Sequence, residues 1–475
     1  MHCQAYFPKN ISNSCLITYF LGLIAVSLAF LNFAIPWYSW ILGCIEVLVF
    51  FYYGRRLPLK YERYSERHIE RRIFWDVVLV YCIWALAYYG FTLAMWDTPW
   101  EQPPWCSIDS GGYFVTGKWL ADCVRDGDLS PWIDWAKAEE GVSDLGYPIV
   151  LAICDLLTGD SIICTRIINA FFAGWMIVLL YRLAKRNFGD RVAMLSAVFT
   201  FLMPSLIFWT ATTMKEAVMT MFTVWYLERV DFVFRKPKVL IKDYFEIILF
   251  SSFLMWFRTA LFAVAILTFV VAIVITDKKI ISTGRKVALG IFLGLCMLFA
   301  FRNEVSQLIG DLMLNREQAK GNLEFRATRE GGNSFAKYLS AGLMAPLVFT
   351  IPFPTMIDLF GQPTQAMLNG GWYVKNIMSF FLLYGLLVMW RTGEWKQHII
   401  VLAYTLGYMA ALALSSYIHA GRFHYPVIPF DMMLAAYGLM HFSRKHMKYF
   451  NMFLAFEFFI ILFWNWFKLK GRGMI

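Results

Sequence analysis

The chain has 475 residues, of which 59% are hydrophobic and only 16% are charged, and its mean hydropathy is +0.55. Soluble domains carry about 25% charged residues, so this composition excludes an ordinary water-soluble fold and indicates a polytopic membrane protein. The net charge of +10 does not indicate nucleic-acid binding, because Lys and Arg cluster in short loops between apolar runs. That pattern is typical of the cytoplasmic loops of membrane proteins.

Apolar runs long enough to cross a hydrocarbon core about 30 Å thick recur from one end of the sequence to the other. We therefore predict an all-α polytopic fold, a bundle of about 13 transmembrane helices. No small-residue cleavage site follows the first run, which is expected to remain as an uncleaved span. In chain order the expected spans are Ser14–Phe33, Trp37–Tyr53, Trp75–Trp96, Ile162–Tyr181, Val192–Trp209, Ala217–Val233, Ile241–Phe257, Leu261–Ile275, Val287–Phe301, Trp372–Trp390, Ile399–Tyr417, Val427–Phe442 and Tyr449–Phe467.

The basic clusters predict which span ends face the cytoplasm. The apolar segment Tyr147–Leu157 is too short to cross the membrane. If it lies along the outer face as an interfacial helix, every basic cluster falls on the cytoplasmic side. The same count leaves the basic tail Lys468–Arg472 outside, against its charge. The clusters are Arg55–Arg72, Arg182–Arg191, Arg229–Lys242 and Lys278–Lys286.

Four segments follow from this topology. Residues 1–73 form a two-span hairpin with a basic cytoplasmic loop, and residues 74–301 form a core with an acid-rich external loop at 97–146. Residues 302–371 form an external loop and a proline-rich re-entrant part, because lipid does not tolerate irregular backbone. Residues 372–475 are the C-terminal spans. The nine cysteines lack CxxC spacing, which argues against zinc, while Cys106 and Cys123 share one loop and are candidates for a disulfide.

Charged residues at the outer ends of spans are candidates for function, because a charge in hydrocarbon is costly. Asp109 precedes a helix expected from Ser110, with Tyr113 one turn later. A carboxylate there can accept a proton or hold a metal ion, although such an Asp is more often a plain N-cap. Lys215 and Glu216 begin another span, where a Lys suits a phosphate and an interfacial ion pair explains the two equally well.

Two further cations are expected at the same face. Arg258 is the only charge in a long apolar stretch, at the turn of a helical hairpin, where snorkelling to the headgroups would also explain it. Arg422 lies between His419 and His424, and a guanidinium binds phosphate oxygens in a fork. A basic cluster outside runs against the positive-inside rule, and an anionic ligand would account for it.

Several short motifs occur in an order and spacing that are more specific than any one motif. They are Asp109 with Tyr113, Gly146–Ala152, Arg166 with Asn169, Leu180–Arg191, Met203–Ser205 ahead of Lys215–Glu216, and an Arg followed by Pro-x-x-Pro within Gly421–Ala436. Together they resemble the GT-C fold membrane glycosyltransferases, in the branch that contains protein O-mannosyltransferases and the bacterial transferase that adds aminoarabinose to lipid A. The likeness is best over roughly residues 75–235.

The resemblance implies that a sugar moves from a polyprenyl-phosphate carrier to an acceptor on the external face by an inverting displacement. It implies Asp109 as the base that deprotonates the acceptor hydroxyl. Glu216 would lie near the carrier phosphate, whose negative charge grows in the transition state. The expected substrate and phosphate ligands are Tyr113, Lys215, Arg258, Arg422 and His424.

The chain departs from this family in three respects. Ser110 follows Asp109 where several members carry a second acid, so the resemblance leaves open whether a divalent ion, Mg²⁺ or Mn²⁺, takes part. Two extra spans precede the family core, and no large soluble domain follows it. The acceptor, whether glycan, lipid or protein, therefore cannot be inferred.

Two other functions compete with this hypothesis. A polysaccharide polymerase or ligase would use a polyprenyl-diphosphate-linked glycan and would depend on a pair of outer Arg residues rather than on Asp109. A transporter or flippase should show internal repeats and charges near the bilayer midplane, and the sequence shows neither. The resemblance favours a bacterial inner membrane with the active face toward the periplasm, and the expected partners are lipid-linked sugar, acceptor and bilayer, without nucleic acid.

Overall fold

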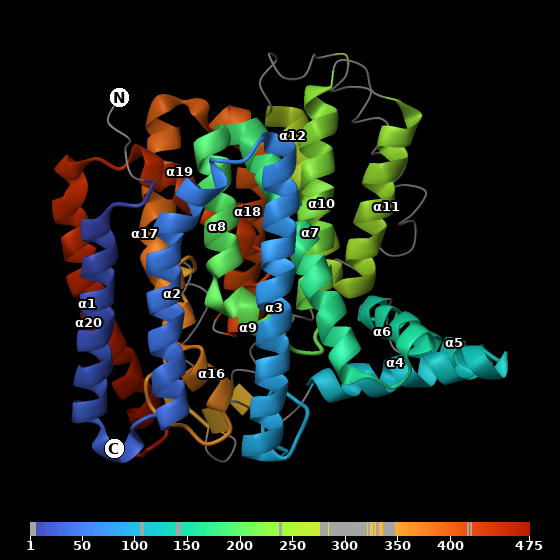
Figure 1. The fold of residues 1–475 in the computed structure, drawn as a ribbon, viewed down its shortest axis with the longest axis horizontal. Helices are drawn as coiled ribbons and strands as arrows, with labels where there is room; N and C mark the ends of the chain where they lie inside the picture. Colours follow the sequence, from blue (N-terminus) through green and yellow to red (C-terminus); the bar gives the residue numbers. More distant parts are fainter. Residues whose placement is uncertain are drawn as a thin grey trace.

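The computed structural model of the chain is a bundle of helices running along one axis, from which a group of shorter helices projects to one side (Figure 1). It describes residues 6–104, 109–138, 144–236, 240–275, 347–415 and 420–475, with short stretches at 284, 321, 324–325, 327–328, 332–335 and 418. The all-α polytopic fold predicted from the sequence is confirmed. Within the described residues, extended pairing is limited to an isolated bridge between Ala34 and Ile357.

Every expected span that falls on described residues is present as a helix, and one of them is bent. The expected span Val287–Phe301 lies outside the described residues. The long helices and the bent pair are α1 (Lys9–Ala29), α2 (Trp37–Tyr61), α3 (Glu66–Trp96), α7 (Ile162–Phe188), α8 (Asp190–Leu202), α9 (Pro204–Thr210), α10 (Glu216–Arg235), α11 (Ile241–Phe257), α12 (Thr259–Ile275), α17 (Asn369–Thr392), α18 (Ile399–Leu414), α19 (Ile428–His441) and α20 (Met447–Lys470).

The number of spans is not settled by these helices. Among the described residues, seven helices are long and apolar enough to cross a membrane, or eight if α8 and α9 form one span bent by 54°. The predicted total of about 13 is therefore not confirmed. The expectation of one continuous span at Val192–Trp209 is corrected, because the helix breaks before Pro204. Proline lacks an N–H donor and its ring clashes with the preceding turn.

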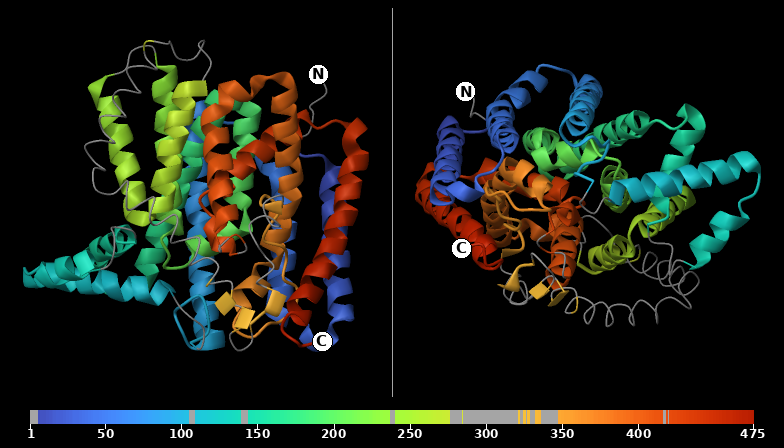
Figure 2. Two further views of the ribbon diagram at one scale, coloured as in Figure 1. Left: turned by 180° about the vertical axis from the view of Figure 1, so that it is seen from behind. Right: turned by 90° about the horizontal axis from the view of Figure 1, so that it is seen from below.

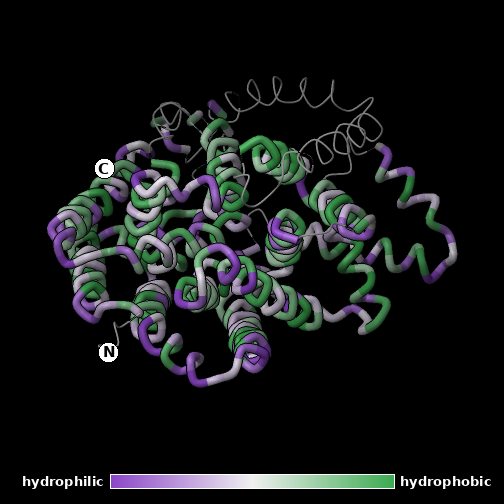
Figure 3. The backbone as a smooth tube through the Cα atoms, turned by 90° about the horizontal axis from the view of Figure 1, so that it is seen from above, coloured by the Kyte–Doolittle hydropathy of each residue, from purple (hydrophilic) through white to green (hydrophobic). Residues whose placement is uncertain are grey.

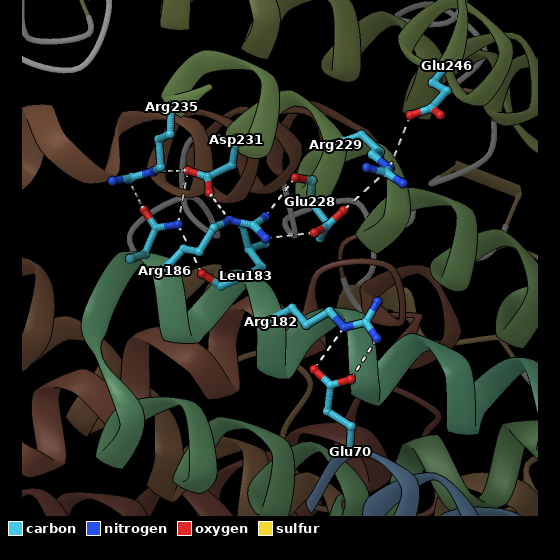
Figure 4. Close-up of polar contacts among 10 residues, drawn as sticks. Glu70, Arg182, Leu183, Arg186, Glu228, Arg229, Asp231, Arg235 and Glu246 are labelled. Atoms are coloured by element: carbon cyan, nitrogen blue, oxygen red, sulfur yellow. Dashed lines mark hydrogen bonds and ion pairs between the residues drawn. The ribbon is translucent and has the colours of Figure 1, made fainter. Parts of the chain in front are cut away.

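The basic clusters that the structure describes lie at one end of the bundle, which we call the basic end. Several of their cations are bound by acids of neighbouring helices (Figure 4). Arg186 Nε lies 2.9 Å from Asp231 Oδ2 and its Nη1 lies 2.7 Å from Glu228 Oε1, which ties α7 to α10. Arg182 holds Glu70 of α3 through two bonds of 2.9 and 2.6 Å. Seen from this end, hydrophilic segments gather at the helix ends (Figure 3).

The projecting group lies toward the opposite end, which we call the α4–α6 end. It consists of α4 (Asp109–Asp126), α5 (Ser130–Ala138) and α6 (Gly146–Thr158), and it extends sideways from the bundle in both views of Figure 2. Helices α4 and α6 cross closely, since a Cβ on Gly117 would lie 2.6 Å from that of Leu151. The segment expected as an interfacial helix at the outer face, Tyr147–Leu157, is thus a separate short helix packed on α4.

The proline-rich segment before α17 is irregular and mostly buried over its described part, residues 347–368, which includes α16 (Pro363–Met367). Polar side chains of the surrounding helices satisfy its backbone. Lys375 Nζ donates to the carbonyl oxygens of Phe349 and Ile351 at 2.9 and 2.7 Å. The backbone N–H of Met356 donates to Asn465 Oδ1 at 2.8 Å. This is how irregular backbone is tolerated inside a membrane protein.

The basic tail that was expected outside also lies at the α4–α6 end. Its first residue, Lys468, is buried and donates to Thr355 Oγ1 at 2.7 Å and to Gln365 Oε1 at 2.6 Å. Arg472 donates to the carbonyl oxygen of Lys468 at 2.8 Å. The conflict between the topology and the charge of this tail is therefore eased, because Lys468 is bound inside the protein.

Candidate active site

Charged residues from five separate parts of the chain meet at the α4–α6 end. Helix α4, the starts of α6 and α10, the α11–α12 turn and the short 3-10 helix η5 (Gly421–His424) each contribute. The sequence-predicted residues among them are Asp109 and Tyr113 in α4, Lys215 and Glu216 at the start of α10, Arg258 between α11 and α12, and Arg422 in η5.

Asp109 and Arg422 form an ion pair through Oδ2 and Nη1, although they are 313 positions apart in the sequence. Helix α4 is described from Asp109, one residue before the start expected at Ser110, and the carboxylate lies in its first turn, where the helix dipole favours negative charge. Both side chains remain partly exposed, 43% for Asp109 and 31% for Arg422. The base expected from the family resemblance and one of its expected phosphate ligands therefore contact each other.

The position of Arg422 is fixed by its neighbours in η5. A Cβ on Gly421 would lie 2.0 Å from the ring of Trp372, so only glycine allows the backbone to pass this close to the indole. The ring of Phe423 lies 4.4 Å from the Arg258 guanidinium carbon and 5.3 Å from that of Arg422. Cation–π attraction to one shared ring therefore holds the two guanidinium groups near each other.

Lys215 lies in the turn before α10 and is only 4% exposed. Its Nζ donates to the carbonyl oxygen of Phe257 at 3.0 Å, forms an ion pair with Asp144, and lies 5.8 Å from the ring centre of Tyr113. Burial, together with the nearby charge of Arg258, lowers the pKa of Lys215 to about 7. The ammonium therefore titrates near neutral pH.

Two polar atoms of this site are buried without a hydrogen-bond partner in the described part of the chain. They are Oε2 of Glu216, a residue that is only 1% exposed, and Nη1 of Arg258. Buried polar groups are nearly always hydrogen bonded in folded proteins. A ligand that offers a donor to Glu216 and an anionic acceptor to Arg258 would satisfy both.

Tyr113 is close enough to feel the charges of this whole group. Burial is the main cause that raises the pKa of its phenol. Glu216 and Asp109 raise the pKa further, whereas Arg422 and Arg258 lower it. The phenol therefore lies among the predicted acids and cations.

A buried acid supports the start of α4. Glu101 is 2% exposed, and its Oε2 accepts a hydrogen bond from Ser110, the residue after Asp109. Tyr88 donates to the backbone oxygen of Glu101 at 3.0 Å, and the buried guanidinium of Arg166 donates to the backbone oxygen of Pro99. Ser110, which occurs where several members of the resembled family carry a second acid, thus contacts a carboxylate supplied by the preceding segment.

One predicted ligand does not join the group. His424 is fully buried, and its Nε2 donates to the carbonyl oxygen of Ile418 at 2.6 Å. This bond ties the imidazole to the backbone of the turn ahead of α19. His419 lies outside the described residues, so the His pair around Arg422 stays a prediction. The candidate disulfide between Cys106 and Cys123 is not formed, because Cys123 is a free, buried cysteine.

Two residues of the site were missed by reasoning from the sequence. Asp144 and Glu101 were treated only as acids of a long external loop. Asp144 stands just before the apolar helix α6, and this position was an available signal. Glu101 had none, because its bond to Ser110 exists only after the loop folds back on α4.

The residues present do not fit a resident metal ion. Among the described residues, no group of three or more His, Cys, Asp or Glu side chains is arranged to hold one. Two carboxylates of the site are already paired with cations, Asp109 with Arg422 and Asp144 with Lys215. We therefore derive no step through a metal.

Comparisons with known proteins found a distant similarity in structure and none in sequence. No protein-family model matches it, and no curated protein matches it by sequence. A solved structure, that of ArnT from Cupriavidus metallidurans bound to undecaprenyl phosphate, is similar with a TM-score of 0.47 at 15% identity, over 80% of this chain. This chain spans 63% of the length of that one. At this TM-score and identity the likeness carries no argument for a function.

Proposed function

We propose that this chain is a membrane glycosyltransferase that moves a sugar from a polyprenyl-phosphate carrier to an acceptor hydroxyl. The observation that carries the proposal is the gathering of Lys215, Arg258 and Arg422 around Asp109 and Glu216 at one end of a membrane bundle. Cations of this kind suit a phosphate, which Arg binds in a fork and Lys as a point charge. A carrier with a prenyl chain would bring that phosphate to the rim of the bundle.

The α4–α6 end would face the periplasm of a bacterial inner membrane. The described Lys and Arg clusters lie at the opposite end, and such clusters favour the cytoplasmic side. The carrier phosphate and the acceptor would then meet outside the cytoplasm.

The reaction is a single inverting displacement. The acceptor oxygen attacks the anomeric carbon while the bond from that carbon to the phosphate oxygen breaks, and the electron pair leaves with the phosphate. Asp109 accepts the proton of the acceptor hydroxyl as general base. No covalent enzyme intermediate is needed.

The cations stabilise the leaving group. Negative charge grows on the phosphate as the bond breaks, so fixed positive charge there lowers the barrier. The unpartnered Nη1 of Arg258 is available to bind a phosphate oxygen, and Glu216 Oε2 is available to accept a hydrogen bond from a sugar hydroxyl. When Arg422 turns to the phosphate, it releases the carboxylate of Asp109 for its role as base.

The test is Asp109→Asn in the full-length protein, reconstituted in liposomes with radiolabelled polyprenyl-phosphate sugars and candidate acceptors. We expect transfer to fall at least about 100-fold, because the variant lacks the base. The matched control is Asp122→Asn, an exposed carboxylate of the same helix that pairs with Arg125 at 2.7 Å, and it should keep its activity. Unchanged transfer by Asp109→Asn, or no transfer by the wild type from any such donor, would overturn the proposal.

A further inference from the structure

Lys215 is the most deeply buried of the three cations, and it already has an anionic partner. Its Nζ is held by the backbone oxygen of Phe257 at 3.0 Å and forms an ion pair with the carboxylate of Asp144. A carrier phosphate that is to bind Lys215, as the proposed function requires, must therefore share the ammonium with Asp144 or replace it.

The carboxylate of Asp144 is weakly tied to the rest of the protein. Asp144 lies outside the helices, just before α6, with a left-handed backbone at φ 73°. Its side chain is 54% exposed, whereas that of Lys215 is 5% exposed. Besides the ion pair, the contact described for this carboxylate is a long hydrogen bond of 3.5 Å from the hydroxyl of Tyr113. Asp144 can therefore turn toward solvent without breaking a buried network, but Lys215 has no such freedom.

The chemistry of the two anions makes them interchangeable on Lys215. A lysine binds as a compact point charge with rotatable donors, so it accepts a carboxylate oxygen or a phosphate oxygen equally well. Because Lys215 is buried and one donor is fixed on Phe257, space for a second large anion beside Asp144 is restricted. We therefore expect Lys215 to bind one anion at a time.

We propose that Asp144 is a displaceable ligand that binds Lys215 until the phosphate of a polyprenyl lipid takes its place. This rests on the proposed function and adds a residue that sets the affinity for the carrier. Asp144 keeps the buried ammonium paired when no lipid is bound, and it competes with the phosphate, which eases release of the carrier after transfer.

The experiment measures the Kd of undecaprenyl phosphate for the full-length protein in phosphatidylcholine nanodiscs, which contain no competing anionic lipid. We expect Asp144→Asn to bind about tenfold more tightly than the wild type, because the amide cannot compete for the ammonium. The control is Asp160→Asn, whose carboxylate pairs with the exposed Lys118 of the same projecting group and should leave Kd unchanged. In a Lys215→Met background, Asp144→Asn should have no effect on Kd.

The outcomes separate this inference from the proposed function. If the wild type and all variants fail to bind undecaprenyl phosphate, the proposed function fails. If the wild type binds but Asp144→Asn binds equally or more weakly, Asp144 does not compete and this inference is overturned while the proposed function stands. Tighter binding by Asp144→Asn that persists in the Lys215→Met background would also overturn it, since the competition would not be for Lys215.

Discussion

The carboxylate of Asp109 contacts Arg422 in the structure, and in the proposed reaction it contacts the acceptor hydroxyl. Its Oδ2 is bound to Arg422, and an oxygen occupied by a guanidinium is not free to contact the acceptor hydroxyl. The carrier phosphate has to draw Arg422 away before Asp109 can act as a base. The lipid-linked donor is therefore expected to bind before the acceptor.

The pH dependence of lipid binding tests the role of Lys215. Burial, with the charges of Arg258 and Arg422, lowers its pKa to about 7. Below that pH the ammonium is charged and ready for a phosphate, whereas above it each binding event must take up a proton. The affinity for undecaprenyl phosphate should therefore fall as pH rises above about 7, by up to about tenfold per pH unit. Binding titrations in nanodiscs from pH 6 to pH 9 would measure this.

Lys215→Met is the reference for that measurement, because the phosphate itself also titrates in this range. The variant should bind more weakly throughout and show a flatter profile above pH 7. Parallel profiles for the two proteins would mean that Lys215 does not exchange a proton when the lipid binds. That result would rule out the proposed role of Lys215 in the phosphate site.

At the scale of elements, the crossing of α17 and α19 positions the loop that carries Arg422. The two backbones touch at a pair of glycines. A Cβ on Gly438 would lie 1.9 Å from the carbonyl oxygen of Phe381, and one on Gly385 would lie 2.8 Å from that of Leu434. Small residues let membrane helices approach this closely without a hydrophobic driving force between them.

Gly438→Ala should force these helices apart, because the obstacle is backbone and cannot rotate away. We expect a loss of stability of about 1–3 kcal/mol, seen as a lower melting temperature of the purified protein. Gly90→Ala in α3, where an added Cβ meets nothing within 4 Å, is the control and should melt like the wild type or slightly higher. Equal melting temperatures for the two variants would contradict the close crossing.

Most helices were predictable from the sequence because lipid imposes a simple rule. A span must be apolar over its length, so the bounds of runs such as Trp372–Trp390 and Ile241–Phe257 fall close to those of α17 and α11. The bend before Pro204 was visible as a proline but was not used. Which side chains meet could not be predicted in the same way. The ion pair between Asp144 and Lys215 depends on how α6 packs against α7 and α11, which both border α10, and no periodicity in the sequence encodes that distance.

At the scale of the whole molecule, the charged side chains at the two ends differ in how they are paired. At the basic end, Arg182 and Arg186 are bound by acids of other helices in short, partly buried bonds, as expected of a structural network. At the α4–α6 end, Arg258 keeps a buried nitrogen without a hydrogen-bond partner in the described residues, and Glu216 keeps an oxygen. Arg229 Nε at the basic end also lacks a hydrogen bond, but it has Glu246 Oε2 at 3.4 Å as an ion-pair partner. This difference is why the proposed chemistry belongs to the α4–α6 end, although the basic end holds more cations.

The most direct test of the central claim is a cryo-electron microscopy structure of the full-length protein in nanodiscs with undecaprenyl phosphate. The account predicts phosphate density within hydrogen-bonding distance of Arg258 Nη1 and Lys215 Nζ, with Arg422 turned toward it and away from Asp109. Density for the phosphate at the basic end, or at the α4–α6 end but out of reach of all three cations, would contradict the account.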